Sequence, residues 1–190
     1  MSGGDFVKVP ALTSYHLLHP KPAVIVVSLD PNGKPSGMTA AWTSPVSMKP
    51  PLISVSISPR RYTYKLIKET GDFTVNVLDV NLVAEAHFFG TRSGRRIDKF
   101  AESKLTTERS SRVKSPHIKE ALAVLECNLY REMKLGDHIL IVGEVLEAYV
   151  KPGAMKRGIY DPKIAKVLMH LGGVGYITIS DEIITVPTYR

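Results

Sequence analysis

The chain has 190 residues, of which 44% are hydrophobic and 23% charged, with a formal net charge of +7. This composition suits one globular domain with a sizeable core, and it excludes a long disordered or low-complexity chain. The single cysteine, Cys127, excludes an intrachain disulfide and a cysteine-based zinc site, which favours a reducing, cytoplasmic compartment. No apolar run is long enough to span a bilayer and residues 1–10 lack a signal core, so we expect no membrane association.

The excess positive charge raises the question of nucleic acid. Lysines and arginines are distributed over residues 60–68, 92–99, 112–119 and 151–166, with acidic residues between them. They form no continuous stripe, and the sequence contains no recognised nucleic-acid-binding motif. A solvated basic surface explains most of these residues, so a basic nucleic-acid-binding β-barrel is the least favoured function class.

The first elements in chain order are a lead-in segment and a hairpin. His16 and His19 are three residues apart, but no further ligand follows at a fitting distance, so we expect a packed turn rather than a metal site. Residues 23–29 and 36–42 read as β-strands on either side of the turn Asp30–Lys34. Because Asn-Gly within this turn is typical of tight hairpins, the two strands are predicted to pair antiparallel.

A polar loop over residues 43–51 and a strand over 52–57 are predicted next. Ser58 is a good N-cap and Pro59 suits a first helical position, so a helix is predicted from here to Gly71. Free amides at a helix N-terminus attract anions, and the forked donors of Arg60 and Arg61 match phosphate. The pattern alone fits a phosphate site and a solvated basic turn about equally well.

The second half of the chain is predicted to close a barrel. A short helix over residues 79–90 and a connecting segment over 104–120 precede two long strands, 121–133 and 138–150. Residues 154–167 suit a helix or a loop, and 176–179 a final short strand. The glycines of residues 172–175 lack the spacing and the following helix of a Rossmann or P-loop motif, so we reject both.

Several motifs in a fixed order give the chain a more specific resemblance. They are Gly37-Met38-Thr39-Ala40-Ala41-Trp42-Thr43-Ser44-Pro45, Pro50-Pro51-Leu52-Ile53-Ser54-Val55, Arg61-Tyr62-Thr63, Gly71-Asp72-Phe73-Thr74-Val75-Asn76, Ser93-Gly94-Arg95-Arg96-Ile97-Asp98-Lys99-Phe100 and Leu135-Gly136-Asp137-His138. Together they resemble the flavin reductase-like family of FMN-binding split β-barrels, which includes flavoredoxins. The resemblance covers about residues 16–178 and implies a mainly β fold with short helices (α+β), in a single domain over 1–190.

The resemblance also implies a set of FMN-binding residues. Backbone groups of residues 39–44 are expected beside the flavin ring, and Ser93, Lys99 and Phe100 near the phosphate or a dimer partner. The full set is Thr39, Ala40, Ala41, Trp42, Thr43, Ser44, Ser56, Ser58, Arg60, Arg61, Thr63, Ser93, Lys99, Phe100 and Tyr176. From the residues alone, the 91–99 segment fits an ordinary basic surface loop equally well.

His138 is the candidate catalytic residue. Its position on a strand after a turn is that of a half-buried structural residue, whereas the resemblance places Asp137 and His138 at the reduced nicotinamide nucleotide. Ser36-Gly37 and Phe89 depart from the usual family pattern, since cysteine often occupies the position of Phe89. These departures leave substrate preference open.

The resemblance implies a homodimeric FMN oxidoreductase. It would take hydride from NADH or NADPH and pass electrons to a flavin, a metal chelate or a protein acceptor. Because the flavin carries the redox chemistry, no general base is needed, which agrees with the absence of an obvious catalytic triad. The alternative is an FMN-bearing electron carrier that does not oxidise nucleotides. No metal, nucleic acid or membrane is expected as a partner.

Overall fold

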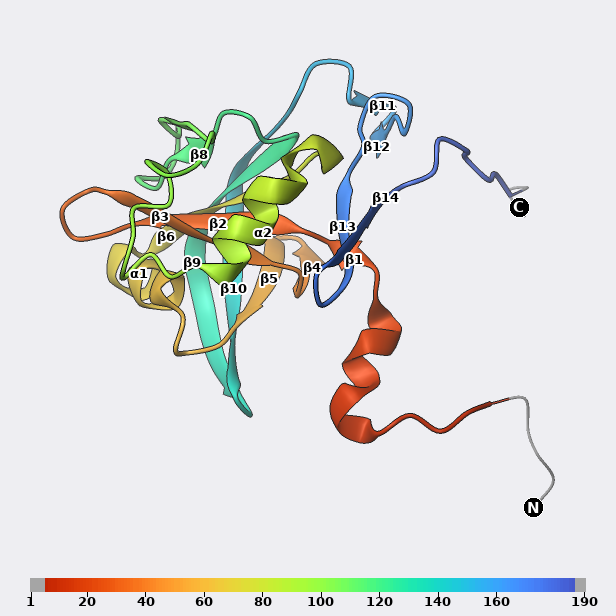
Figure 1. Ribbon diagram of the computed structural model, residues 1–190. Coiled ribbons are helices and arrows are strands. Elements are labelled where there is room, and N and C mark those ends of the chain that lie inside the picture. The colour runs from red at the N-terminus through yellow and green to blue at the C-terminus, as the bar shows by residue number, and fades with distance from the viewer. Residues whose placement is uncertain (1–5, 187–190) are drawn as a thin grey trace.

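Seven strands form one antiparallel sheet that makes up the body of the molecule, in the order β3-β2-β6-β9-β10-β5-β4 (Figure 1). The computed structural model describes residues 6–186, so the ends of the predicted domain, residues 1–5 and 187–190, lie outside the described residues. The strands of this sheet are β2 (Val24–Leu29), β3 (Pro35–Ala40), β4 (Thr43–Met48), β5 (Pro51–Ile57), β6 (Asp72–Val77), β9 (Ala123–Leu135) and β10 (His138–Val150).

The remaining elements surround this sheet. The helical elements are η1 (Ala11–Leu18), α1 (Tyr62–Thr70), η2 (Val80–Leu82) and α2 (Val83–Thr91). The remaining strands are β1 (Lys21–Pro22), β13 (Leu168–Gly172) and β14 (Gly175–Thr178), which form a separate sheet, and the pairs β7 (Thr107–Glu108) with β8 (His117–Ile118) and β11 (Met155–Lys156) with β12 (Ile159–Tyr160). Between residues 6 and 186, no helix has the length and apolarity needed to cross a membrane.

Strand β2 is apolar except for Ser28 because both of its faces are covered. Val24 and Val26 belong to a cluster that includes Ile67 of α1, whereas Ile25 and Val27 belong to a cluster that includes Phe89 of α2. Successive side chains of a strand point to opposite faces, so this arrangement requires a continuous apolar run. The two helices are thereby packed onto opposite faces of the central strands.

Both predicted hairpins are confirmed. β2 pairs antiparallel with β3, and their turn is held by the Asp30 carboxylate, which accepts hydrogen bonds from the amides of Asn32 and Lys34 at 2.8 and 2.9 Å. Gly33 takes the positive φ of 79° that the turn requires. β9 and β10 pair over their whole lengths, so the long strands predicted from the sequence lie in the middle of the sheet and present His138 at its end.

Two local predictions were wrong. The predicted loop over residues 43–51 contains strand β4, where Thr43 pairs with Val55, and Pro45 is tolerated because β4 is an edge strand. The helix predicted to begin at Ser58 begins at Tyr62, because a turn in which the Arg61 amide donates to the Ser58 carbonyl (3.0 Å) comes first. It does end at Gly71 in a left-handed conformation, as predicted.

Two further segments, residues 154–167 and the lead-in around His16 and His19, also differ from expectation. Residues 154–167, for which a helix or a loop was expected, include the β11–β12 hairpin, whose turn contains Arg157 and Gly158 at positive φ values of 53° and 82°. The lead-in around His16 and His19 includes helix η1, which has no buried residue and extends away from the sheet (Figure 1). The expectation of a packed turn was therefore wrong, because its apolar side chains face away from the described core.

Candidate functional site

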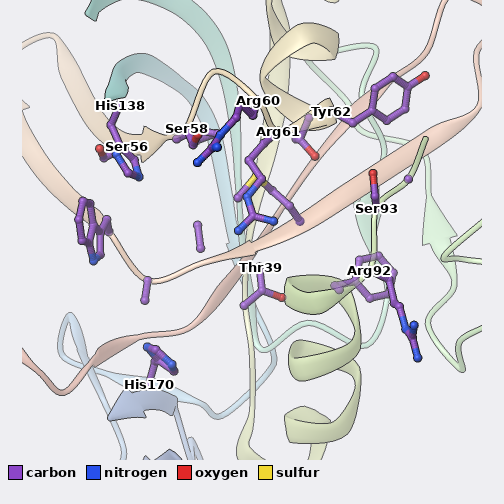
Figure 2. A pocket seen from close by; sticks show the side chains of 18 of the residues that line it. Thr39, Ser56, Ser58, Arg60, Arg61, Tyr62, Arg92, Ser93, His138 and His170 are labelled. Carbon is purple, nitrogen blue, oxygen red and sulfur yellow. The ribbon is translucent and has the colours of Figure 1, made fainter. Parts of the chain in front are cut away.

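A cavity of about 650 Å³ lies where β3, the end of β5, the start of α1 and the loop after α2 meet. Helix η1 and strand β13 complete its wall from the two ends of the chain. Figure 2 shows His138 and His170 at one end of this pocket and Arg92 and Ser93 at the other, with Arg60 and Arg61 between them. The cavity thus joins a cationic region to a region rich in imidazole.

Most of the residues predicted from the sequence line this cavity. They are Thr39, Ala40, Ala41, Trp42, Ser56, Ser58, Arg60, Arg61, Thr63, Ser93, Lys99, Asp137 and His138.

Four predicted residues are not part of the lining. Thr43 and Ser44 pair with β5 as members of β4, and Phe100 packs against Phe89 with ring centroids 5.1 Å apart. Tyr176 lies behind His170, with ring centroids 5.2 Å apart. Any contact of these four with a ligand in the cavity stays a prediction.

The cationic end of the cavity comprises Arg61, Arg92 and Lys99 with the hydroxyls of Thr63 and Ser93. Lys99 is only 4% exposed, and its ammonium donates to the backbone carbonyl of Phe89 at 2.8 Å. Burial, with a further contribution from the charge of Arg61, lowers the pKa of Lys99 from 10.5 to about 8. A buried ammonium that is hydrogen-bonded only to a neutral carbonyl is poorly compensated, and an anion in the cavity would relieve this.

The loop that carries Ser93 and Lys99 is fixed from outside the cavity. Asp98 accepts hydrogen bonds from the amides of Phe100 and Ala101, both at 3.1 Å, and pairs with Lys34 of the β2–β3 hairpin at 2.8 Å. Consecutive residues therefore have separate tasks: Asp98 anchors the loop, Lys99 reaches the cavity and Phe100 enters the core. This explains the Asp-Lys-Phe motif.

Helix α1 directs its first turn at the same region. Arg61 precedes the helix, and Thr63, in its first turn, is 2% exposed. No side chain caps this end, so the first amides of α1 remain available to a ligand. Free amides, the helix dipole and two arginines nearby are suited to a phosphate group.

The neighbouring wall is held in place by hydrogen bonds of β3 and β5. The Thr39 hydroxyl donates to the Ala86 carbonyl of α2 at 2.6 Å, and the Ser56 amide donates to the Trp42 carbonyl at 2.9 Å. These bonds fix residues 39–42 as one rigid edge of the cavity. A flat ring could lie along it and bond to backbone groups.

Asp137 and His138 form the pair that the sequence suggested. The Asp137 carboxylate lies 2.8 Å from His138 Nδ1, and this hydrogen bond lowers the pKa of Asp137. The His138 ring packs on Trp42, with centroids 4.9 Å apart and planes inclined by 31°. Because Asp137 bonds Nδ1, the ring orientation is fixed and Nε2 is the nitrogen left for a ligand.

Sequence reasoning missed most of the imidazole end. This end comprises Tyr15, His16, His19, Trp42, His138 and His170, all of which line the cavity. The spacing of His16 and His19 was noticed in the sequence, but its relation to His170 was not, since that residue follows 150 residues later. The β1–β13 pairing, which aligns Lys21 with His170, is what brings these segments together.

The described residues offer neither a metal site nor a reactive thiol near the cavity. Among residues 6–186, no group of three or more histidine, cysteine or acidic side chains is placed to hold a metal ion. Cys127 is buried, and burial raises the pKa of its thiol to about 12. It is therefore an inert core residue.

Comparison with known proteins places this architecture among flavoproteins. A family model described as "Flavin reductase like domain" matches residues 16–171. An uncharacterized protein of Archaeoglobus fulgidus is 42% identical over 151 residues, which is 78% of this chain and 84% of the relative. A flavin reductase of Pseudomonas putida is 30% identical over 133 residues, with 70% of this chain and 75% of the relative covered.

Solved structures agree with the sequence matches. Flavoredoxin of Desulfovibrio vulgaris (Miyazaki F) superposes with a TM-score of 0.82 at 25% identity, covering 97% of both chains. The description of another matching solved structure states that it has a split barrel domain. The predicted mainly β split-barrel fold is thus confirmed.

Proposed function

Since this chain belongs to the flavin reductase-like family, we propose that it binds FMN and uses it to take hydride from NADH or NADPH. Electrons would then pass to a flavin, a metal chelate or a protein acceptor. The similarity to a flavin reductase of Pseudomonas putida supports this reductase activity. The observation that carries the proposal is the single cavity in which a cationic end faces an aromatic and imidazole end.

FMN fits the residues of this cavity. Its phosphate suits the cationic end, where the buried ammonium of Lys99 lacks an anionic partner among the described residues and Arg61 lies at the start of α1. Its flat ring suits the edge formed by residues 39–42, whose backbone offers donors and acceptors to the polar ring atoms. The chain supplies both kinds of contact at once.

Bound FMN supplies the chemistry, by accepting a hydride at the flavin ring and later releasing two electrons. The protein's part is to orient the two partners and to exclude water. We propose that His138 contacts the nicotinamide nucleotide through Nε2, while Asp137 and Trp42 hold its ring from the other sides. His138 would then act on the hydride step without contributing to FMN affinity.

We also propose that the protein works as a homodimer. Helix η1 buries none of its residues, and Phe6, Leu12 and Leu17 are 95%, 92% and 68% exposed. Edge strand β4 adds Met48, which is 91% exposed. A second copy that covered these side chains would also close the cavity beside Tyr15 and His16. A monomer in sedimentation that still holds FMN stoichiometrically would contradict this.

Anaerobic titration of the FMN-loaded protein tests the reductase proposal. We expect loss of flavin absorbance on addition of NADH or NADPH, with one nucleotide effective at lower concentration. A protein that binds FMN and is bleached by neither nucleotide, although dithionite bleaches it, would instead be an electron carrier. The structural match to a flavoredoxin makes that the second candidate function. Filtration after reduction would show whether the flavin stays bound.

The role of His138 is tested in the same assay. In His138→Ala, we expect stopped-flow reduction by the nucleotide to slow while reduction by dithionite and FMN affinity stay unchanged. His87→Ala is a matched control, because His87 packs against Tyr176 and lies outside the cavity lining. Equal reduction rates in His138→Ala and the wild type, at both low and saturating nucleotide, would remove His138 from the site.

A further inference from the structure

Eight aromatic and imidazole rings follow one another in an unbroken row from α2 to the start of β10. Successive ring centroids are between 4.2 and 6.3 Å apart. In order, the row is His87, Tyr176, His170, His19, His16, Tyr15, Trp42 and His138. Its last six members are the imidazole end of the cavity, so a ligand there would meet rings on several sides.

Histidines are concentrated at this place. The chain has six histidines, and four of them, His16, His19, His138 and His170, line the one cavity. They come from η1 and its following turn, from β10 and from β13. Only His138 has a role in the function proposed above. The other three therefore need a separate explanation.

The hydrogen-bonding capacity of these histidines is largely unused. Both ring nitrogens of His19 and Nδ1 of His170 are shielded from solvent and have no partner of good hydrogen-bond geometry among the described residues, although the backbone of Leu171 lies close to the His19 ring. Nε2 of His170 lies 3.2 Å from the carbonyl of Gly173. Shielded polar groups without partners are unfavourable in a folded protein, and because the His19 and His170 rings line the cavity, a small rotation of either ring would give its nitrogens a partner in a ligand with polar atoms.

We propose that the imidazole end of the cavity binds a quinone, held by stacking on Tyr15 and Trp42 and by hydrogen bonds from His19 and His170 to its carbonyl oxygens. The quinone would be the electron acceptor of the reductase, so the inference rests on the proposed function and names its substrate class. A metal ion is a poorer occupant, because no group of three ligands is placed for one among residues 6–186.

The match to a quinone lies in the amphoteric nature of neutral imidazole. Each neutral ring has one donor and one acceptor nitrogen. It can therefore donate to the carbonyl of a quinone and accept from the hydroxyl of the corresponding hydroquinone. Burial, with lesser contributions from the nearby His170 and His16, lowers the pKa of His19, which keeps that ring in its neutral form. An aromatic carboxylate would be better served by a fixed cation.

The reaction balances without a further reactant. Two electrons and two protons leave the reduced flavin, and the quinone gains the same two electrons and two protons to become a hydroquinone. The imidazoles bond the oxygens on which the protons arrive. The shielded thiol of Cys127, the chain's only cysteine, leaves no accessible thiol for covalent addition to a quinone probe.

Equilibrium dialysis of the FMN-loaded protein against 1,4-naphthoquinone tests the proposal. The double variant His19→Phe/His170→Phe keeps an aromatic ring at both positions but removes the ring nitrogens. We expect it to bind the quinone at least about tenfold more weakly, while naphthalene, which has the same ring size but no oxygen, binds weakly and equally to both proteins. His87→Phe, at the outer end of the row, is the matched control and should bind like the wild type.

Other outcomes decide against the proposal. Unchanged quinone affinity in the double variant, or naphthalene binding as tight as quinone binding in the wild type, would overturn it. Tighter binding of 1-naphthoate than of the quinone would also overturn it, in favour of an aromatic acid. If the double variant fails to hold FMN, His19→Gln replaces it: an amide retains a donor and an acceptor and should preserve binding, whereas His19→Leu should lose it. Dialysis involves no nucleotide, so this test and the bleaching test fail separately.

Discussion

The two ends of the cavity are attached to the rest of the molecule in different ways. The cationic end stands on buried residues: Thr63 and Lys99 are 2% and 4% exposed, and Asp98 ties the loop that carries Lys99 to Lys34. The imidazole end depends on η1, which has no buried residue, and on the separate sheet of β1, β13 and β14. One end is part of the core, whereas most of the other is assembled from the periphery, with only Trp42 and His138 supplied by the main sheet and its edge.

This difference suggests a division of labour. A cofactor that must stay in one position is best bound where the side chains are already fixed, because little conformational entropy is then lost on binding. Partners that come and go are better accommodated by segments with fewer core contacts. We therefore expect mutations at the cationic end to change FMN affinity, and mutations at the imidazole end to change the use of nucleotide and acceptor.

The largest effect is expected from removing the phosphate contacts. Arg61→Ala combined with Thr63→Ala should weaken FMN by about 10- to 150-fold, since a hydrogen bond to a charged group contributes about 1.5–3 kcal/mol. Riboflavin, which lacks the phosphate, should bind nearly as before in a fluorescence titration. Lys65→Ala, an exposed lysine on the same helix, is the control. An equal loss of affinity for both flavins would show that the phosphate lies elsewhere.

Lys99 should link FMN binding to pH and to stability. Its pKa of about 8, against 10.5 when unfolded, means that the unfolded chain binds more protons between these values, so stability should rise with pH across that window. Lys99→Met should remove the rise and stabilise the ligand-free protein at pH 7 by on the order of 1–3 kcal/mol, while weakening FMN. Denaturant unfolding at pH 7 to 10.5 measures this; a parallel pH profile in both proteins would contradict it.

Gly94→Ala should disturb the cationic end through its loop. A Cβ at this position would clash with Ser36 Oγ and lie 3.2 Å from the Tyr62 ring, so the Ser36 side chain must rotate and the loop carrying Ser93 is pushed away from the Tyr62 ring. We expect FMN to bind about three- to tenfold more weakly, as for a displaced phosphate contact of about 1 kcal/mol. Gly173→Ala, at the imidazole end, has free space around its Cβ; its positive φ of 54° strains the turn between β13 and β14, but FMN affinity should stay unchanged. If Gly173→Ala weakened FMN binding more than Gly94→Ala, the phosphate would have to be assigned to the imidazole end instead of the cationic end.

The smallest effect is expected at Asp137. Its carboxylate is 93% exposed, and exposed ion pairs contribute little. Asp137→Asn keeps a hydrogen-bond acceptor for His138, so reduction by nucleotide should change within about threefold and FMN affinity should not change. Stopped-flow bleaching provides the measurement. A loss as large as that in His138→Ala would give Asp137 a direct part in nucleotide binding.

The cationic end could be predicted from the sequence because its residues are close together along the chain. Arg61 and Thr63 are two residues apart, and Ser93 and Lys99 share one motif, whereas Arg92, just before that motif, was missed. Side chains in a short connection between a strand and a helix are positioned by those two neighbouring elements, so the local sequence is enough to place them in one cavity. The strand order and the first residue of α1 were harder to predict. An edge strand such as β4 and a tight turn before a helix leave only weak signals in the local sequence.

The imidazole end could not be predicted because it depends on long-range pairing. His16 and His19 meet His170 only through the two-residue strand β1, which is too short to recognise by alternation. Tyr176 likewise has its place behind His170 because β13 pairs with β14. Peripheral sheets of this kind carry no hydrophobic periodicity, so only the three-dimensional structure joins their residues.

A titration of the wild-type protein with FMN and with riboflavin tests the central claim most directly. If the cationic end holds the phosphate, FMN should bind at least about tenfold more tightly than riboflavin at pH 7, corresponding to about 1.4 kcal/mol. This preference should shrink as the pH rises above 8 and Lys99 loses its charge. Equal affinities at pH 7 would contradict the account, because the ammonium and guanidinium groups would then have no part in binding FMN.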